Sequence, residues 1–103
     1  MYIELDISSG VPNPVWALDE ADWISLHRLQ GTLLPCREVP PTLPGLGYRG
    51  FCYGVAGNRF RAYAGYVHSA EVVLADPTLS IERFLGDRLP IQFAHFRAKL
   101  DLQ

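Results

Sequence analysis

Hydrophobic and polar residues alternate along positions 2–8 of the chain. Ile3, Leu5 and Ile7 would point to one side, and Glu4 and Asp6 between them to the other. A period of two residues is typical of a β-strand with one buried face. The pattern therefore predicts a half-buried strand over these positions.

Capping residues predict a helix after this strand. Asp19 is suited to the N-cap, and Asp22 stands three residues later, as in a shortened capping box. Leu18 and Trp23 have the spacing of a hydrophobic staple, which fixes the angle at which the chain enters a helix. We expect the helix to end at Gly31 or to continue for two more residues. Residues 34–47, which contain four prolines, then predict a long loop.

The middle of the chain predicts a β-hairpin. The dipeptide Gly57-Asn58 favours a two-residue turn, because both residues tolerate a positive φ. This turn would set Tyr53 opposite Ala62 and Phe51 opposite Ala64, with both aromatic side chains on the packed face. The ranges predicted as strands in this region are 48–56, 59–67 and 70–75.

Two further helices are predicted near the C-terminus. Asp76 is suited to an N-cap and Pro77 to the first helical position, and Gly86 would end this helix. Residues 90–100 fit a final helix, while the alternation at its start also fits a strand.

The order of these elements predicts an α+β two-layer domain that spans residues 1–103 as a single domain. We expect a mostly antiparallel, four-stranded sheet with helices packed on one face. The other face would be open, and the residues expected on it are Tyr2, Glu4, Asp6, Cys52, Arg59, Arg61 and Tyr63.

The composition is that of an ordinary globular chain. The net charge of −2 argues against a general binder of polyanions, so nucleic acid is not the expected partner. No apolar run is long enough to span a membrane, and the acidic residues near the N-terminus do not resemble a signal peptide; we expect a cytoplasmic protein. Cys36 and Cys52 are expected as free thiols, with a disulfide between them as the alternative.

Catalytic or metal-binding residues do not assemble into a recognisable set. The conceivable metal ligands are His27, Cys36, Cys52, His68 and His95. Zinc sites usually draw on closely spaced pairs of ligands, and these five residues form none, so we expect no metal and no cofactor. Cys52 could act as a nucleophile beside His27 or His68, and Glu4 with Asp6 could act as an acid–base pair. Ion pairs with Arg59 or Arg61 are the simpler explanation for the two carboxyl groups.

The segment 49–56 partly resembles the octamer motif of RNA-recognition domains. Arg49, Gly50, Phe51 and Tyr53 agree with it. Cys52, Gly54 and Ala56 depart from it. That resemblance implies aromatic residues exposed for base stacking, but the expected hairpin places them on the packed face.

The stretch Ser9-Gly10-Val11-Pro12-Asn13-Pro14-Val15-Trp16 is a stiff connection, because each proline fixes its own φ and favours an extended predecessor. Together with 47–51, Gly-Tyr-Arg-Gly-Phe, it resembles a group of small uncharacterised bacterial and fungal proteins that carry an S-G-R-P-N-P-x-W signature. The resemblance covers roughly residues 5–85, and Val11 stands where that group has arginine. It implies no activity, cofactor or partner.

Two interpretations of this turn follow. In the first, Asn13 bonds nearby backbone and Arg49 bonds carbonyls around the two prolines, so the turn is only stiffened. In the second, Asn13, Trp16, Arg49 and the proline-rich loop form a recognition surface.

A non-enzymatic module that binds a protein partner is the function we expect. An immunity protein, an inhibitor or a regulatory subunit would each fit. The expected binding residues are Asn13, Trp16, Arg49, Arg59, Arg61 and Tyr63. A small enzyme or ligand-binding domain is the alternative, with Glu4, Asp6, Cys52, Arg61 and Tyr63 on the open face, and RNA binding is the third class.

Overall fold

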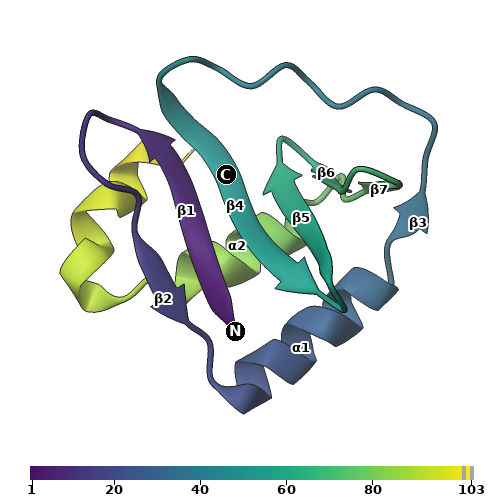
Figure 1. Ribbon diagram of the computed structural model, residues 1–103, viewed down its shortest axis with the longest axis horizontal. Coiled ribbons are helices and arrows are strands. Elements are labelled where there is room, and N and C mark those ends of the chain that lie inside the picture. The colour runs from purple at the N-terminus through teal and green to yellow at the C-terminus, as the bar shows by residue number, and fades with distance from the viewer. Residues whose placement is uncertain (101, 103) are drawn as a thin grey trace.

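Seven β-strands form one sheet in the computed structural model, which describes residues 1–100 and 102. Their order across the sheet is β2-β1-β4-β5-β6-β7-β3, and all neighbours are antiparallel (Figure 1). The strands are β1 Tyr2–Ser8, β2 Val15–Ala17, β3 Leu34–Pro35, β4 Gly47–Val55, β5 Asn58–Tyr63, β6 Tyr66–His68 and β7 Val73–Ala75.

The prediction of four strands was therefore wrong, for two physical reasons. β2 and β3 have only three and two residues, too few for an alternating pattern to show. The predicted strand 59–67 is in fact two strands, β5 and β6, separated by a turn at Ala64-Gly65. The predicted strand 70–75 is shortened to β7.

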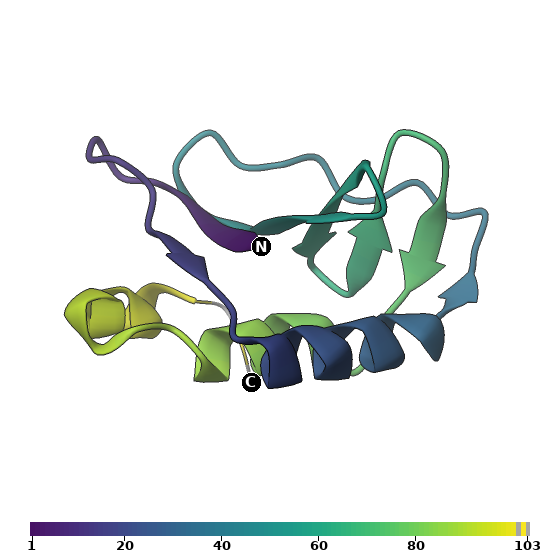
Figure 2. The same ribbon diagram turned by 60° about the horizontal axis from the view of Figure 1, so that its bottom comes forward.

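The helices lie together on one face of the sheet, as Figure 2 shows, which confirms a two-layer α+β arrangement. They are α1 Glu20–Gly31, α2 Ser80–Asp87 and the 3₁₀ helix η1 Ile91–Lys99. No helix among residues 1–100 covers the opposite face, which we call the open face. The tail 90–100 is thus helical, but with the tighter 3₁₀ winding.

The core lies between the sheet and the helices. Ile3, Leu5 and Ile7 are fully buried, which confirms the alternation predicted for β1. Their neighbours in the core are Trp16, Leu26, Tyr48, Phe51, Tyr53, Phe60, Ala62, Val67, Ile81, Leu85 and Phe96.

The turn between β4 and β5 lies one residue earlier than predicted. Ala56 and Gly57 have φ values of 50° and 82°, so the left-handed pair is Ala56-Gly57 and not Gly57-Asn58. The register consequently shifts by two residues, and Tyr53 lies opposite Phe60 while Phe51 lies opposite Ala62. A shift of two preserves the faces, so the aromatic side chains of 51 and 53 remain on the packed side.

Helix α1 begins where the capping residues predicted. The backbone N–H of Asp22 donates to Asp19 Oδ1 at 2.8 Å. Leu18 and Trp23 are both partly buried against the core, as a staple requires. Gly31 is the last helical residue, but Thr32 follows in a right-handed conformation, so the left-handed end considered for Gly31 does not form.

Helix α2 begins at Ser80, four residues later than Asp76, because Leu79 adopts a left-handed φ of 58°. Asp76 nevertheless caps it from a distance. Its Oδ1 accepts from the N–H and the hydroxyl of Ser80 at 3.0 and 2.6 Å, and its Oδ2 accepts from the N–H of Ile81 at 2.9 Å. Gly86, predicted as the end, lies inside the helix.

The substitution Asp76→Ala is expected to lower the free energy of unfolding by about 2 kcal/mol, because it removes the acceptor for three donors at a buried helix start. Urea denaturation would measure this loss. Asp87→Ala, at the other end of α2, is the matched control, since its exposed ion pair with Arg97 contributes little. Equal stability of the two variants would contradict the capping role of Asp76.

Candidate functional site

The amide of Asn13 connects the Pro-Asn-Pro turn to β1. Asn13 Oδ1 accepts from the backbone N–H of Ile7 at 3.0 Å, and Asn13 Nδ2 donates to Glu4 Oε2 at 2.9 Å. The N–H of Leu5 donates to the carbonyl of Pro14 at 3.0 Å. Because proline has no N–H to return, the pairing of β2 with β1 ends there, and the side chain of Asn13 replaces a strand backbone at Ile7.

These contacts bear on both interpretations of the turn. Asn13 uses its amide oxygen and its amide nitrogen within the fold, as a stiffened turn requires. Arg49 does not bond the proline carbonyls in this structure; its guanidinium lies 3.5 Å from Asp6. Trp16 is 8% exposed, and its ring lies 6.3 Å from that of Phe51, so it belongs to the core and not to a surface.

Ion pairs cross the open face between β1, β4 and β5. Arg59 donates to Glu4 Oε1 at 2.9 Å, and Arg61 donates to Asp6 Oδ2 at 2.8 Å. Arg61 also donates to the carbonyl of Arg49 at 2.6 Å. The structure therefore brings four of the expected binding residues to the two carboxyl groups of β1: Asn13, Arg49, Arg59 and Arg61.

A β-bulge positions Arg49 beside Asp6. Leu5 lies opposite Phe51 and Ile7 lies opposite Tyr48, so Asp6 faces two residues of β4, Arg49 and Gly50. The extra residue turns Tyr48 toward the packed side, where it is buried. Tyr63, the remaining expected binding residue, is half-buried with its ring 5.7 Å from Tyr48, and it packs against the core.

A pocket of about 350 Å³ lies on the open face beside these ion pairs. Cys52 forms its floor, Arg59 and Arg61 come from β5, and His68, the last residue of β6, is followed by Ser69. The pairing of Arg61 with His68 across β5 and β6 brings the two side chains to the same face. The charges that surround the pocket are thus two guanidinium groups, with Glu4 and Asp6 behind them.

Burial shifts the pKa values of two groups in the pocket, the Cys52 thiol and the His68 imidazole. It raises the pKa of the Cys52 thiol, and the positive charges of Arg61 and Arg59 oppose that rise only in part. Burial, followed by the charge of Arg61, lowers the pKa of His68. A neutral thiol and a neutral imidazole are therefore favoured at pH 7, which does not fit the thiolate that a nucleophilic cysteine needs.

Cys52 is expected to react with a disulfide reagent at pH 8 at least ~10-fold more slowly than Cys36, because it is buried and its pKa is raised. Thiol titration of the variants Cys36→Ser and Cys52→Ser would measure the two rates separately. Urea should make both thiols react at similar rates. A fast reaction of folded Cys36→Ser would contradict this expectation.

Of the histidines and cysteines considered as metal ligands, only Cys52 and His68 line this pocket. No group of three or more His, Cys, Asp or Glu residues within the described chain is arranged to hold a metal ion. Both cysteines are free thiols in the structure. His27 lies on α1, on the helix side of the sheet, and Cys52 faces the open side.

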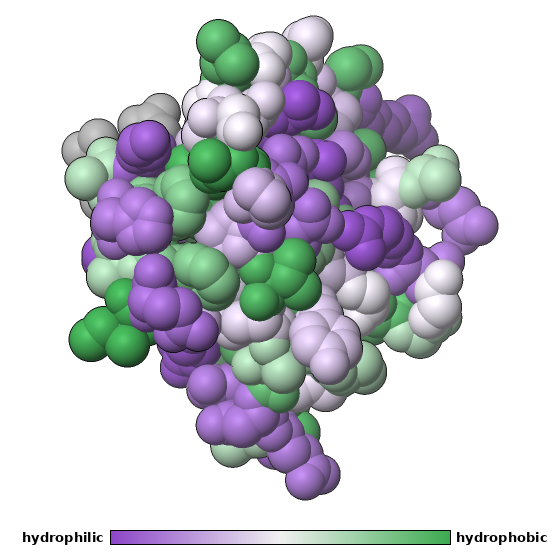
Figure 3. Space-filling view, turned by 60° about the vertical axis from the view of Figure 1, so that its left-hand side comes forward, coloured by the Kyte–Doolittle hydropathy of each residue, from purple (hydrophilic) through white to green (hydrophobic). Residues whose placement is uncertain are grey.

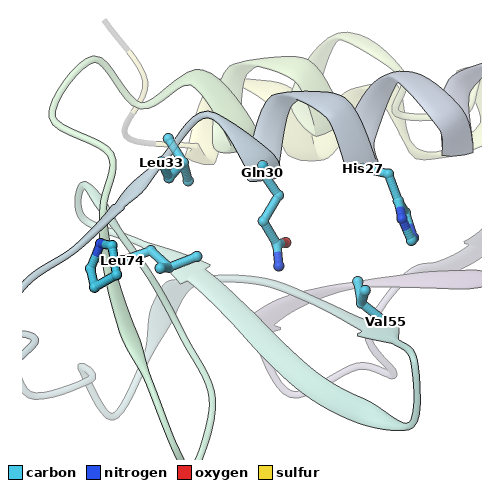
Figure 4. A pocket seen from close by; sticks show the side chains of 7 residues that line it. His27, Gln30, Leu33, Val55 and Leu74 are labelled. Atoms are coloured by element: carbon cyan, nitrogen blue, oxygen red, sulfur yellow. The ribbon is translucent and has the colours of Figure 1, made fainter.

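A second hollow, of about 270 Å³, lies between α1 and the sheet (Figure 4). His27 and Gln30 point from the helix toward the sheet, with Val55 and Leu74 across from them. The hydroxyl of Tyr53 donates to Gln30 Oε1 at 2.6 Å. This polar contact is internal to the fold, and no Asp, Glu, Lys or Arg of the described chain lines the hollow.

The aromatic residues of the RNA-type motif are not available for stacking. Phe51 and Tyr53 are fully buried beneath the sheet, as the packed-face prediction required. Exposed apolar residues are spread over several elements, and Leu34, Val39 and Ile91 are 73%, 88% and 89% exposed. At the edge near β1 and β2, Tyr2 is 69% exposed and Val15 is 51% exposed. On the side of the molecule seen in Figure 3, hydrophobic residues are interspersed among hydrophilic ones.

Sequence reasoning missed the place of His68 and Ser69 beside Arg61. The signal that could have found it is the repeated dipeptide Ala-Gly, at 56–57 and again at 64–65. Each forms a two-residue turn, and the second sets Arg61 opposite His68.

Comparisons with family models, with curated proteins and with solved structures gave no significant match to this chain. None of the helices in the described residues is both long and apolar enough to cross a membrane.

Proposed function

We propose that this chain is a non-enzymatic module that binds a protein partner on its open face, at the side formed by β2, β1, β4 and β5. The observation that carries the proposal is the exposure of Tyr2 and Val15 on the face that carries Arg59. Tyr2 and Glu4 alternate with the buried Ile3, and Val15 lies opposite Glu4, so these side chains share one face.

The residue types on this surface fit a protein interface. Tyrosine and arginine are enriched among the residues that contribute most of the binding free energy at protein interfaces. The side chain of Arg59 is 68% exposed, so it can reach a partner while it pairs with Glu4.

Charge indicates what the partner presents. Three arginines face two carboxyl groups here, so this surface has one excess positive charge within a chain of net charge −2. We therefore infer a partner with an apolar contact for Tyr2 and acidic residues around it. Glu4 and Asp6 are both held by arginines, which supports an ion-paired surface over an acid–base pair.

The experiment begins with size-exclusion chromatography and light scattering on the purified chain, followed by its use as bait in a host lysate. The bait variants Tyr2→Ser and Arg59→Glu are compared with Ile91→Ser and Arg37→Glu, which change exposed residues elsewhere. A stoichiometric partner retained by the wild type and the controls, and lost from both open-face variants, supports the proposal. A partner retained by all baits, no partner at all, or a stable dimer of the chain overturns it.

A further inference from the structure

The pocket beside the ion pairs is lined by hydrogen-bond donors and positive charges, with no acidic side chain among its described lining residues. It offers the guanidinium groups of Arg59 and Arg61, the imidazole of His68 and the hydroxyl of Ser69, above the thiol of Cys52. None of the residues that line it is acidic. Such a set of donors without an acceptor charge is suited to a negatively charged group.

Hydrogen-bond donors remain in this lining after the internal contacts are formed. Arg59 uses Nη2 for Glu4, and Arg61 uses Nη1 for Asp6 and for the carbonyl of Arg49. A guanidinium has five N–H donors, so each arginine keeps others beyond those that contacts among residues 1–100 use. Ser69 Oγ accepts from the N–H groups of Glu71 and Val72 at 3.2 and 3.3 Å, and its own proton is left to donate elsewhere.

Arg61 is also held in place. The side chain of Arg61 is only 22% exposed and is fixed at Asp6, so its guanidinium is oriented before any ligand arrives. Preorganised arginines lose little conformational freedom on binding, and their planar donors match the paired oxygens of carboxylate and phosphate groups.

We propose that this pocket binds the oxyanion group, phosphate or carboxylate, of a small molecule, through Arg59, Arg61 and Ser69. This site shares Arg59 with the proposed protein-binding surface, whereas neither Tyr2 nor Val15 lines it. A volume of about 350 Å³ is that of a small-ligand site.

His68 provides a spectroscopic readout. The groups that face it are Arg61 and Arg59 from β5 and Cys52 from β4, with Glu4 and Asp6 of β1 beyond the arginines. Since burial and Arg61 lower the pKa of this imidazole, a bound oxyanion should raise it again.

The test is a nuclear magnetic resonance titration of the full chain with inorganic phosphate and, separately, with acetate. Sodium chloride at matched ionic strength is the reference. We expect saturable shifts at the amides of Ser69 and Ala70, a raised pKa of His68, and a Kd of about 1 mM for the probe that fits. Arg59→Gln should weaken binding at least ~5-fold, since it removes a charge-assisted donor; its exposed side chain makes the variant safe to fold.

Arg37→Gln is the matched control, because it removes the same charge from an exposed loop position. Saturation by phosphate alone indicates a phosphorylated ligand, and saturation by acetate alone a carboxylated one; either supports the site. The absence of a saturable shift with either probe overturns the proposal. An equal loss of binding in Arg59→Gln and Arg37→Gln also overturns it.

Discussion

Replacing Gly50 with alanine is expected to lower the free energy of unfolding by about 4 kcal/mol, the largest effect of any substitution proposed for this chain. Gly50 lies in the bulge of β4 with a φ of 95°. A Cβ at this position would lie 2.3 Å from the carbonyl oxygen of Ala62 and 2.8 Å from Cβ of Tyr63. Neither atom can rotate away, so β4 and β5 would have to separate. Urea denaturation would measure the loss.

Gly10→Ala separates the two causes of this cost. Gly10 has a similar φ of 83°, but nothing lies within 4 Å of the Cβ that alanine would add. Its substitution should cost about 1–2 kcal/mol, from the left-handed backbone alone. If Gly50→Ala were no more destabilising than Gly10→Ala, the close approach of the two strands at the bulge would be contradicted.

Glu82→Ala is expected to lower the free energy of unfolding by about 3 kcal/mol. Glu82 is 2% exposed, and its carboxyl group joins α2 to the turn between β5 and β6. It accepts from the hydroxyl of Tyr48 at 2.6 Å and from the N–H groups of Ala64 and Gly65 at 3.3 and 3.1 Å. Alanine removes the acceptor for all three donors at once.

The contribution of Tyr48 can be isolated with a double-mutant cycle. Tyr48→Phe should cost about 1 kcal/mol alone, and less when Glu82 is already alanine, because the two residues share one hydrogen bond. Glu71→Ala, an exposed glutamate, should change stability by less than about 0.5 kcal/mol. Additive effects of the Tyr48 and Glu82 substitutions would contradict the shared contact.

The elements that the sequence predicts well are those whose signal is local. The alternation of Ile3, Leu5 and Ile7 predicts β1, and Asp19 with Asp22 predicts the start of α1. The register of β4 and β5 could not be predicted in this way, because it depends on whether Ala56 accepts a left-handed φ, which it does. Asparagine accepts a left-handed φ more readily than alanine, so the sequence favoured a turn at Gly57-Asn58 instead.

The candidate site shows the same division. The ion pairs of Arg59 and Arg61 with Glu4 and Asp6 follow from the alternation of two strands. The burial of Trp16 could not be predicted without β2, which is too short to show a pattern. Glu82 is an acidic residue in the first turn of a helix, a position that usually faces solvent, and only the packing of α2 against the β5–β6 turn buries it.

The order of strands has a consequence for how the chain folds as it is synthesised. Strands β4 to β7 follow one another in sequence and in space, so short-range pairing assembles them. The flanking strands β1 and β3 come earlier in the chain, and β1 cannot pair with β4 until residues 47–55 have left the ribosome. Until then Ile3, Leu5 and Ile7 have no sheet to cover them. β1 is therefore synthesised before β4 but completes its pairing only after β4 has been made.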